Sequence, residues 1–323
     1  MRDSIVETII AYKQKTGISI RKLLGFVGLS SSKFYQWRAR YGLVNKHNGK
    51  IPRGFWILPW EKQAIIDYAL KHEAEGYRRL CYQMLDEDIV AVSPSSVYRT
   101  LKEVGLLSKF NGKPSKRGKG FSQPKRPHEH WHIDISYVNV LGSFLFLIAI
   151  IDGYSRYIVH HELRASMESY DVEIVLQRAL EKFPLARPRI ISDNGSQFIA
   201  RDFKAFIRHK GLMHVKTSVR YPESNGKIER FFQTAKKEHI RKKSFLSLVD
   251  ARRQIAAYIH YYNTKRLHSA INYLTPEDML LGRAEQRLKE RDRKLREARA
   301  ARLEQFNKFK TTLIAKPNLS NSR

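Results

Sequence analysis

The stretch from residue 131 to residue 163 limits the possible folds most, because it has the pattern of three neighbouring strands. Residues 131–140 alternate in polarity with a period of two, which places Asp134 in the middle of a strand and opposite to the apolar face. A Leu-Gly-Ser turn leads into the apolar run 144–151, which is typical of a buried central strand. A third strand at 157–163 follows, so the sequence predicts an antiparallel meander.

Helices and strands then alternate, which extends the meander into a five-stranded mixed sheet with flanking helices. The expected elements are a helix at 172–183, a strand at 189–193, a helix at 203–207, a strand at 213–217 and a helix at 222–240. A right-handed crossover from the meander lays the fourth strand parallel to the first and brings Asp193 beside Asp134. Glu229, on the last helix, can point at the two aspartates.

Three carboxylates in one cleft predict a site for divalent metal ions. Without cations between them, Asp134, Asp193 and Glu229 would repel one another and raise their own pKa values. Hard oxygen ligands suit Mg²⁺ or Mn²⁺, and two ions about 3.5–4 Å apart suit the in-line displacement of a phosphodiester. A single acid is more often a capping or salt-bridged residue. We expect that structural role for Asp152, Asp171, Asp202 and Glu238.

The charge of the chain predicts a polyanionic partner. Lysine and arginine number 60 against 31 acidic residues, which gives a formal net charge of +29. An anionic membrane surface is the competing partner. The longest apolar run, 144–151, is too short to span a bilayer, and the first residues lack the pattern of a signal peptide. Because Cys81 is the single cysteine, an internal disulfide is excluded, and we expect a cytoplasmic protein without a membrane partner.

Residues 1–45 predict a small helical DNA-binding domain of the helix-turn-helix type. Three short helical segments follow one another, and the third places Phe34 and Trp37 inward. The predicted contacts with the bases of a major groove are the outward residues Ser32, Lys33, Tyr35, Gln36 and Arg38. The alternative is an ordinary three-helix bundle whose outer helix is a solvated polar face.

A second helix-turn-helix domain is expected at 58–107. A helix from residue 60 is followed by a segment that includes Arg78 and Arg79, and a last helix opens at a Ser-Pro-Ser-Ser sequence. We expect these two arginines to contact DNA, together with the exposed side of the helix that opens at Ser95.

Two basic segments lie outside these domains. Residues 108–128 carry seven cations and no acid, which predicts a linker that follows a phosphate backbone through Lys116 and Arg117. The alternative for this linker is a flexible tether without contacts. The tail at 284–323 is either a DNA arm or a solvated basic helix.

Three short motifs resemble the Asp-Asp-Glu signature of transposases and retroviral integrases. They are His132-Ile133-Asp134, the run from Ser192 to Phe198 and the run from Ser224 to Phe232, with 35 residues between Asp193 and Glu229. Further segments resemble the second-frame transposase of the bacterial insertion-sequence-three family. These segments are Leu29–Trp37, Gly76–Arg79, Tyr262-Asn263, Arg266–Ala270 and Thr275-Pro276, and the resemblance extends over residues 18–282.

The resemblance implies a ribonuclease-H-like catalytic core at 129–245, Mg²⁺ as cofactor and a bacterial, nucleoid-associated enzyme that joins the ends of a mobile element to DNA. Asp134, Asp193 and Glu229 would be the catalytic and metal-binding carboxylates. Asn225, Lys227 and Lys236 would contact DNA near them, since all three lie on the helix of Glu229 or at its start. The implied DNA partners are the terminal inverted repeats of the element and a target. Rival functions are a nuclease on the same fold and a non-catalytic DNA-binding regulator.

Joining two ends predicts a homo-oligomer, at least a dimer on DNA. We expect one contact in the helical segment 246–283, through an apolar stripe outside the catalytic fold that consists of Leu248, Ile255, Ile259 and Tyr262. The basic helix from Ala284 to Lys310 is expected to reach DNA that the neighbouring copy holds. In the resembling family, an upstream frame often supplies another helix-turn-helix and a leucine zipper. The chain is therefore expected to work with such a partner or to act alone.

Overall fold

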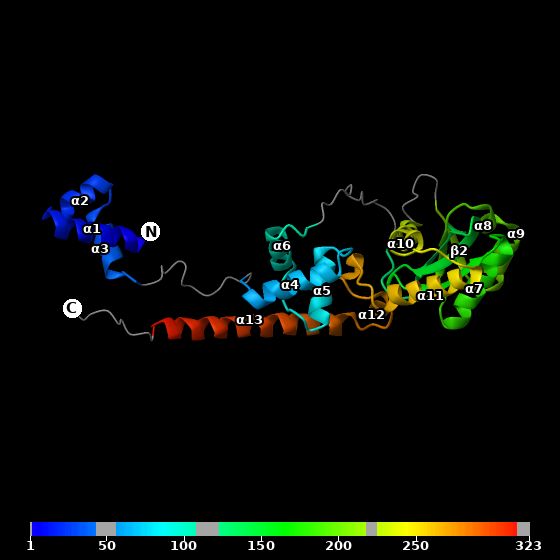
Figure 1. The fold of residues 1–323 in the computed structure, drawn as a ribbon. Coiled ribbons are helices and arrows are strands. Elements are labelled where there is room, and N and C mark those ends of the chain that lie inside the picture. Colours follow the sequence, from blue (N-terminus) through cyan, green and yellow to red (C-terminus); the bar gives the residue numbers. More distant parts are fainter. Residues whose placement is uncertain (1, 43–55, 108–122, 218–224, 315–323) are drawn as a thin grey trace. The chain divides into compact units, whose positions relative to one another are not determined.

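The computed structural model describes residues 2–42, 56–107, 123–217 and 225–314, with side chains up to residue 308 (Figure 1). The described residues form two compact units. One comprises residues up to 56 together with those from 303 on, and the other comprises residues 57–302. Lys116 and Arg117, for which we predict phosphate contacts, lie outside the described residues.

The first unit contains a bundle of three short helices, α1 (Arg2–Thr16), α2 (Ile20–Val27) and α3 (Ser31–Ala39). Phe34 of α3 is completely buried against Val6 and Ile9 of α1 and Leu24 of α2. Gly28 has a φ of +65° and ends α2, a left-handed conformation that glycine adopts without strain. The helices lie where the hydrophobic periodicity predicts them.

The second unit begins with three more helices, α4 (Pro59–Lys71), α5 (Tyr77–Asp86) and α6 (Pro94–Glu103). Ser93 caps α6, because its hydroxyl accepts a hydrogen bond from the backbone N–H of Ser96 at 3.3 Å. Proline follows as the first helical residue, a position where its missing N–H costs nothing. The small core between the helices contains Ile65, Leu80, Met84, Val97 and Leu101.

The five strands form one mixed sheet in the order β3-β2-β1-β4-β5. Their bounds are β1 (His130–Val140), β2 (Ser143–Asp152), β3 (Ile158–Arg164), β4 (Arg189–Ser192) and β5 (Met213–Lys216). The first three strands are antiparallel neighbours, whereas β4 is parallel to β1 and β5 is parallel to β4. The predicted meander and the crossover that lays β4 beside β1 are both confirmed.

Helices cover both faces of the sheet. On one face, α7 (Ser169–Lys182), α8 (Ser196–Ile199) and α9 (Arg201–His209) bury the residues of β1 and β2 that include Ile133 and Ile148. On the other face, α10 (Gly226–Glu238) and α11 (Leu248–Thr264) pack on a second cluster that includes Val138 and Leu147. The period-two alternation of β1 therefore directs Asp134 toward the face that α10 covers.

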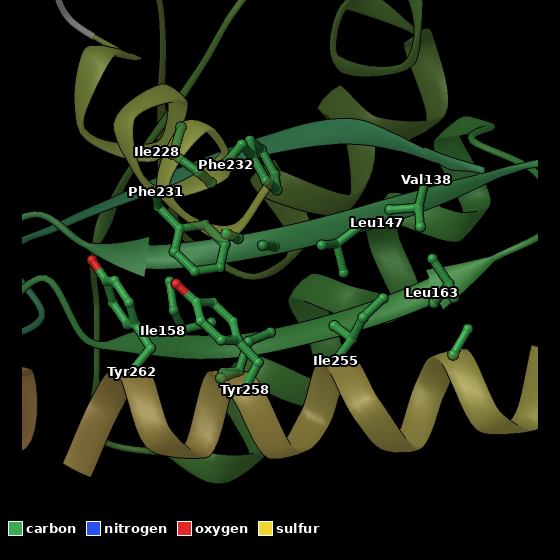
Figure 2. Packing of buried hydrophobic residues seen from close by; sticks show 14 of the residues in the cluster. Val138, Leu147, Ile158, Leu163, Ile228, Phe231, Phe232, Ile255, Tyr258 and Tyr262 are labelled. Carbon is green, nitrogen blue, oxygen red and sulfur yellow. The ribbon is translucent and has the colours of Figure 1, made fainter. Parts of the chain in front are cut away.

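The apolar stripe of α11 lies inside the core, so the predicted dimer contact there is wrong. Figure 2 shows Ile255, Tyr258 and Tyr262 pointing from α11 toward the strands, and Ile259 belongs to the same buried cluster. Asn263, near the end of α11, binds the backbone of Ile158 in β3. Its side chain accepts a hydrogen bond from the N–H of Ile158 at 2.8 Å and donates to the carbonyl of Ile158 at 3.1 Å. The helix is thus fixed to β3 by both packing and hydrogen bonds.

Short helical elements follow, and then one long helix. The turns η2 (Ile240–Lys242) and η3 (Ser269–Ile271) flank α11, and α12 (Pro276–Leu280) precedes α13 (Ala284–Ile314). Inside the second unit, α13 runs beside α4 and α5 (Figure 1). No helix among the described residues is long and apolar enough to cross a membrane.

Candidate active site

Asp134 lies in the middle of β1, between the buried side chains of His132 and Ser136. Its carboxylate is half-buried and accepts a hydrogen bond from the N–H of Ile135 at 2.8 Å. The position follows from the alternation of the strand, since a polar residue in this register faces α10 rather than the apolar cluster beneath α7.

Asp193 directly follows β4 and lies beside Asp134. The parallel pairing of β1 with β4 matches His132 with Ile191, and each aspartate comes two residues after its member of this pair. The carboxylate of Asp193 accepts a hydrogen bond from the N–H of Gly195 at 2.9 Å. Asn194 holds the same turn to the next strand by donating to the carbonyl of Thr217 at 2.8 Å.

Glu229 lies in the first turn of α10 and is exposed. The start of this helix is held close to Asp134 by Asn225, whose side-chain amide donates to the carbonyl of Ile133 at 3.5 Å. Asn225 is only 1% exposed, which leaves almost no surface of this side chain for the DNA contact that the sequence predicts. Its side chain anchors α10 on the strand instead.

The electrostatics of Asp134 link the three carboxylates. Burial raises the pKa of Asp134 to about 7, and the charges of Asp193 and Glu229 add to this rise. The N–H of Ile135 and the ammonium of Lys236 act in the opposite direction. Among the described residues, no three His, Cys, Asp or Glu side chains are close enough together to hold one metal ion. The structure thus places the aspartates on adjacent strands and Glu229 within electrostatic reach, without a closed ligand cluster.

Lys227 forms a contact within the chain. Its ammonium donates a hydrogen bond to the carbonyl of Gly153 at 2.9 Å. Burial, reinforced by the charge of Arg156, lowers the pKa of Lys227 to about 7. In this structure the side chain ties α10 to the turn after β2, and its DNA contact stays a prediction.

That turn is closely packed against β1. The N–H of Gly153 donates to the carbonyl of His130 at 2.8 Å, and a Cβ at this position would lie 3.0 Å from the Nε2 of His132. Asp152 closes the turn by accepting hydrogen bonds from the N–H of His128 at 2.8 Å and the N–H of Ser155 at 2.7 Å. The structural role predicted for Asp152 is confirmed.

Two more single acids are structural. Asp171 forms an ion pair with Arg164 at 2.8 Å. Glu238, at the end of α10, accepts both prongs of the Arg266 guanidinium at 2.7 and 2.6 Å. The role of Arg266 is not predicted from the sequence, although the residue lies in one of the motifs that carry the family resemblance.

Lys236 remains a candidate for binding a phosphate beside the carboxylates. It is half-buried two turns after Glu229, and its charge lowers the pKa of Asp134. Burial, with the nearby Arg241, lowers the pKa of Lys236 itself. A partly desolvated ammonium next to acidic groups suits a phosphate oxygen better than a fully hydrated one does.

The residues predicted to read DNA in the first bundle lie on the outside of α3. Ser32, Lys33, Tyr35, Gln36 and Arg38 are all exposed, as the sequence predicts. In the second bundle, Arg78 is exposed. Arg79 is instead half-buried and forms ion pairs with Glu75 and, at 3.8 Å, with Glu238. Arg79 is thus engaged within the chain, and its contact with DNA stays a prediction.

Comparisons with known proteins agree with this geometry. The family described as "Integrase core domain" matches residues 124–222, and a second family with the same description matches residues 210–276. The transposase InsD of insertion element IS2 from Escherichia coli is 30% identical over 223 residues, which cover 65% of this chain and 74% of that protein. The chain therefore belongs to the insertion-element transposases that have an integrase core.

Other relatives have the same character. The transposase for insertion sequence element IS629 from Shigella sonnei is 23% identical, with 77% of this chain and 87% of that protein covered. The transposase for element IS904 from Lactococcus lactis is 30% identical over 154 residues, and the chain spans only 61% of its length. Among solved structures, the catalytic core domain of HTLV-2 integrase in complex with magnesium is 18% identical, covers 48% of this chain and 97% of that domain, and has a TM-score of 0.40. The sheet order and flanking helices confirm the predicted ribonuclease-H-like core.

Proposed function

We propose that this chain is a DNA transposase that cuts at the ends of its element and joins the freed 3′-hydroxyls to target DNA. One observation carries this proposal: Asp134 and Asp193 lie side by side on adjacent strands, and Glu229 is near enough to affect the pKa of Asp134. A non-catalytic DNA-binding regulator has no need of such a costly arrangement. A simple nuclease would have no evident use for two additional helical units.

Divalent cations fit the three carboxylates. Burial raises the pKa of Asp134 to about 7, and the charges of Asp193 and Glu229 add to this rise, so a cation among the three carboxylates would favour the charged form. Asp134, Asp193 and Glu229 would hold two Mg²⁺ ions, with Mn²⁺ as a substitute, because hard cations prefer carboxylate oxygens. When bound, such ions lower the pKa of an attacking water or hydroxyl and stabilise the leaving oxygen.

The remaining residues of the site orient the DNA and the carboxylates. Lys236 would bind the phosphate next to the bond that is cut. Asn225 and Lys227 keep the start of α10 on β1 and on the turn after β2, so that Glu229 stays opposite the aspartates. The outward side of α3 and the exposed side of α6 would recognise the element ends, with the linker residues Lys116 and Arg117 binding phosphates between them.

The proposal is tested with Asp134→Asn, Asp193→Asn and Glu229→Gln on labelled end DNA in Mg²⁺. Each variant is expected to lose cleavage and joining but to bind end DNA as the wild type does. The substitution removes a carboxylate of the proposed metal site and leaves every phosphate contact in place. Asp202→Asn is the matched control, because Asp202 is an exposed acid in the same core. Near wild-type turnover in any of the three variants would contradict the role of that residue. A wild type that binds without cleaving would favour a regulator, and cleavage without joining would favour a nuclease.

We also propose that the active species on DNA is at least a dimer, since two ends have to meet and one set of three carboxylates acts on one strand at a time. The surplus charge of +29 opposes association of the free chains, and DNA phosphates would neutralise it. Light scattering with and without end DNA measures this directly. One chain per competent pair of ends would refute the dimer, and a need for an added upstream-frame protein would show that the chain does not assemble alone. Binding to DNA in this way would associate the protein with the bacterial nucleoid.

A further inference from the structure

The basic helix α13 directs much of its charge inward, onto α4 and α5. Arg291 and Arg302 are 4% and 7% exposed, although both are arginines on a long and highly charged helix. Arg302 pairs with Glu61 of α4 at 2.9 Å, and Glu61 itself is 3% exposed. Lys294 pairs with Asp88, just after α5, at 2.7 Å. Neither of the two roles predicted for this segment, a DNA arm or a solvated helix, describes this face.

Part of the charge on the outward side of α13 is paired within the helix itself. Lys289 pairs with Glu285 at 2.6 Å, and Arg293 pairs with Glu297 at 2.9 Å. Such pairs of opposite charge four residues apart are typical of a solvated helix surface. These paired residues of α13 therefore offer a phosphate backbone little unpaired charge, whereas Arg296 and Arg299 are exposed.

Arg291 connects three separate parts of the second unit. Its guanidinium holds both carboxylate oxygens of Asp86, at the end of α5, at 2.8 and 2.6 Å. It also donates to the carbonyls of Asn272 at 3.2 Å and Tyr273 at 2.8 Å. The same group lies 4.8 Å above the ring of Tyr82, a cation–π distance. A planar fork with five donors can make all of these contacts at once, whereas an ammonium cannot.

The loop that Arg291 holds lies in the same segment as a residue that contacts α10. Asn272 and Tyr273 have φ values of +57° and +56°; asparagine often adopts this conformation at the end of a helix, whereas it is uncommon for tyrosine. Tyr273 also stacks on Tyr82 of α5 with ring centroids 4.9 Å apart. Seven residues before Tyr273, Arg266 pairs with Glu238 at the end of α10, the helix that carries Glu229.

We propose that Arg291 is a positioning residue that fixes the helical bundle of α4, α5 and α6 to the catalytic core. DNA bound by this bundle would then place one particular phosphate at the carboxylates. The path runs from Asp86 through Arg291 to the loop at 272–273, and from Arg266 of the same segment to Glu238 on α10. The proposal rests on the proposed function for its DNA substrate. The attachment itself is a property of the free chain and can be measured without DNA.

The first measurement is hydrogen exchange of the free, full-length protein. Arg291→Met should accelerate exchange in the segment 266–275 and at the end of α5, because the loop at 272–273 loses the contacts that hold it. Arg293→Met is the matched control: it removes an exposed arginine two residues away and should change neither segment. Arg291→Lys keeps the charge without the fork, and it is used where Arg291→Met does not fold. Unchanged exchange in the Arg291 variant would overturn the attachment.

The second measurement is cleavage of end DNA in Mg²⁺, with the binding of the same DNA in parallel. The Arg291 variant should bind within threefold of the wild type. Cleavage at the wild-type phosphate should fall at least tenfold, and the remaining cuts should spread to neighbouring phosphates, which general loss of stability would not cause. Cutting at the wild-type position and rate, despite faster exchange, would overturn the positioning role alone. If the wild-type protein binds end DNA without cleaving it, the proposed function is refuted. The hydrogen-exchange result would still show whether Arg291 attaches the helical bundle to the core.

Discussion

Replacing Asp134 by asparagine is expected to stabilise the metal-free protein although it removes the proposed chemistry. Burial and the neighbouring Asp193 and Glu229 raise the pKa of Asp134 from 3.8 to about 7. The native state therefore binds an extra proton between these two pH values, and the free energy of unfolding falls as the pH rises through this window. The destabilisation caused by the charged carboxylate of Asp134 is absent below the pKa of the unfolded state and complete above the pKa of the folded state. A rise of about three units corresponds to ~4 kcal/mol at pH 8 and roughly 1.5 kcal/mol at pH 5.

Asparagine has nearly the same shape and no charge, so the variant should gain about 2–4 kcal/mol at pH 8 and clearly less at pH 5. Native-state hydrogen exchange of the amides in β1 and β2, in the full chain with chelator present, measures the free energy of opening at each pH. Asp202→Asn, which removes an exposed acid, should show no such difference between the two pH values. An equal gain at pH 5 and pH 8, or no gain at all, would refute burial of a charged carboxylate as the cause.

Three further predictions concern other sites. Asn263→Ala should lower the free energy of unfolding by roughly 2–3 kcal/mol, since both backbone groups of Ile158 lose their partner. Asn263→Asp should lower the free energy of unfolding further, because a carboxylate cannot donate to the carbonyl of Ile158. Thermal melts of both variants measure these changes. Lys236→Ala should reduce the slope of log affinity against log salt by about 0.9 on end DNA, and an unchanged slope would mean that this lysine binds no phosphate. Cys81 should react with iodoacetamide at pH 8 only after unfolding, because burial raises the pKa of its thiol to about 12; rapid alkylation of the native chain would contradict this.

The sheet and the two aspartates could be predicted because their signals are local. The alternation around Asp134 depends only on which side of a strand each side chain occupies, and the structure has β1 at His130–Val140 against a predicted 131–140. Asp193 was placed by the simple fact that it ends a short strand. A right-handed crossover can lay the fourth strand beside the first and parallel to it, and the structure confirms this pairing.

What covers the apolar side of a helix could not be predicted in the same way. The stripe with Ile255 and Tyr262 shows that α11 has an apolar side, but the periodicity does not say what covers it. The structure places it on the sheet of the same chain rather than on a second copy. Lys227 shows the same limit, since nothing local distinguishes a lysine that donates to the carbonyl of Gly153 from one that faces DNA.

The formal net charge does not show how much positive charge is free to bind DNA, because some cations are paired with carboxylates of the same chain. Three arginines join distant parts of the second unit by binding carboxylates. Arg266 and Arg291 each use two N–H groups of the guanidinium, whereas Arg302 binds Glu61 through Nε alone. The carboxylate partners of Arg291 and Arg302 lie more than 200 residues away in sequence. These cations are already neutralised. By contrast, α3 contains Lys33 and Arg38 and no acidic residue, and both cations are exposed. Because counterion release depends on unpaired surface charge, exposed cations such as those of α3 should contribute more to the salt dependence of end binding than the paired arginines Arg291 and Arg302 of α13.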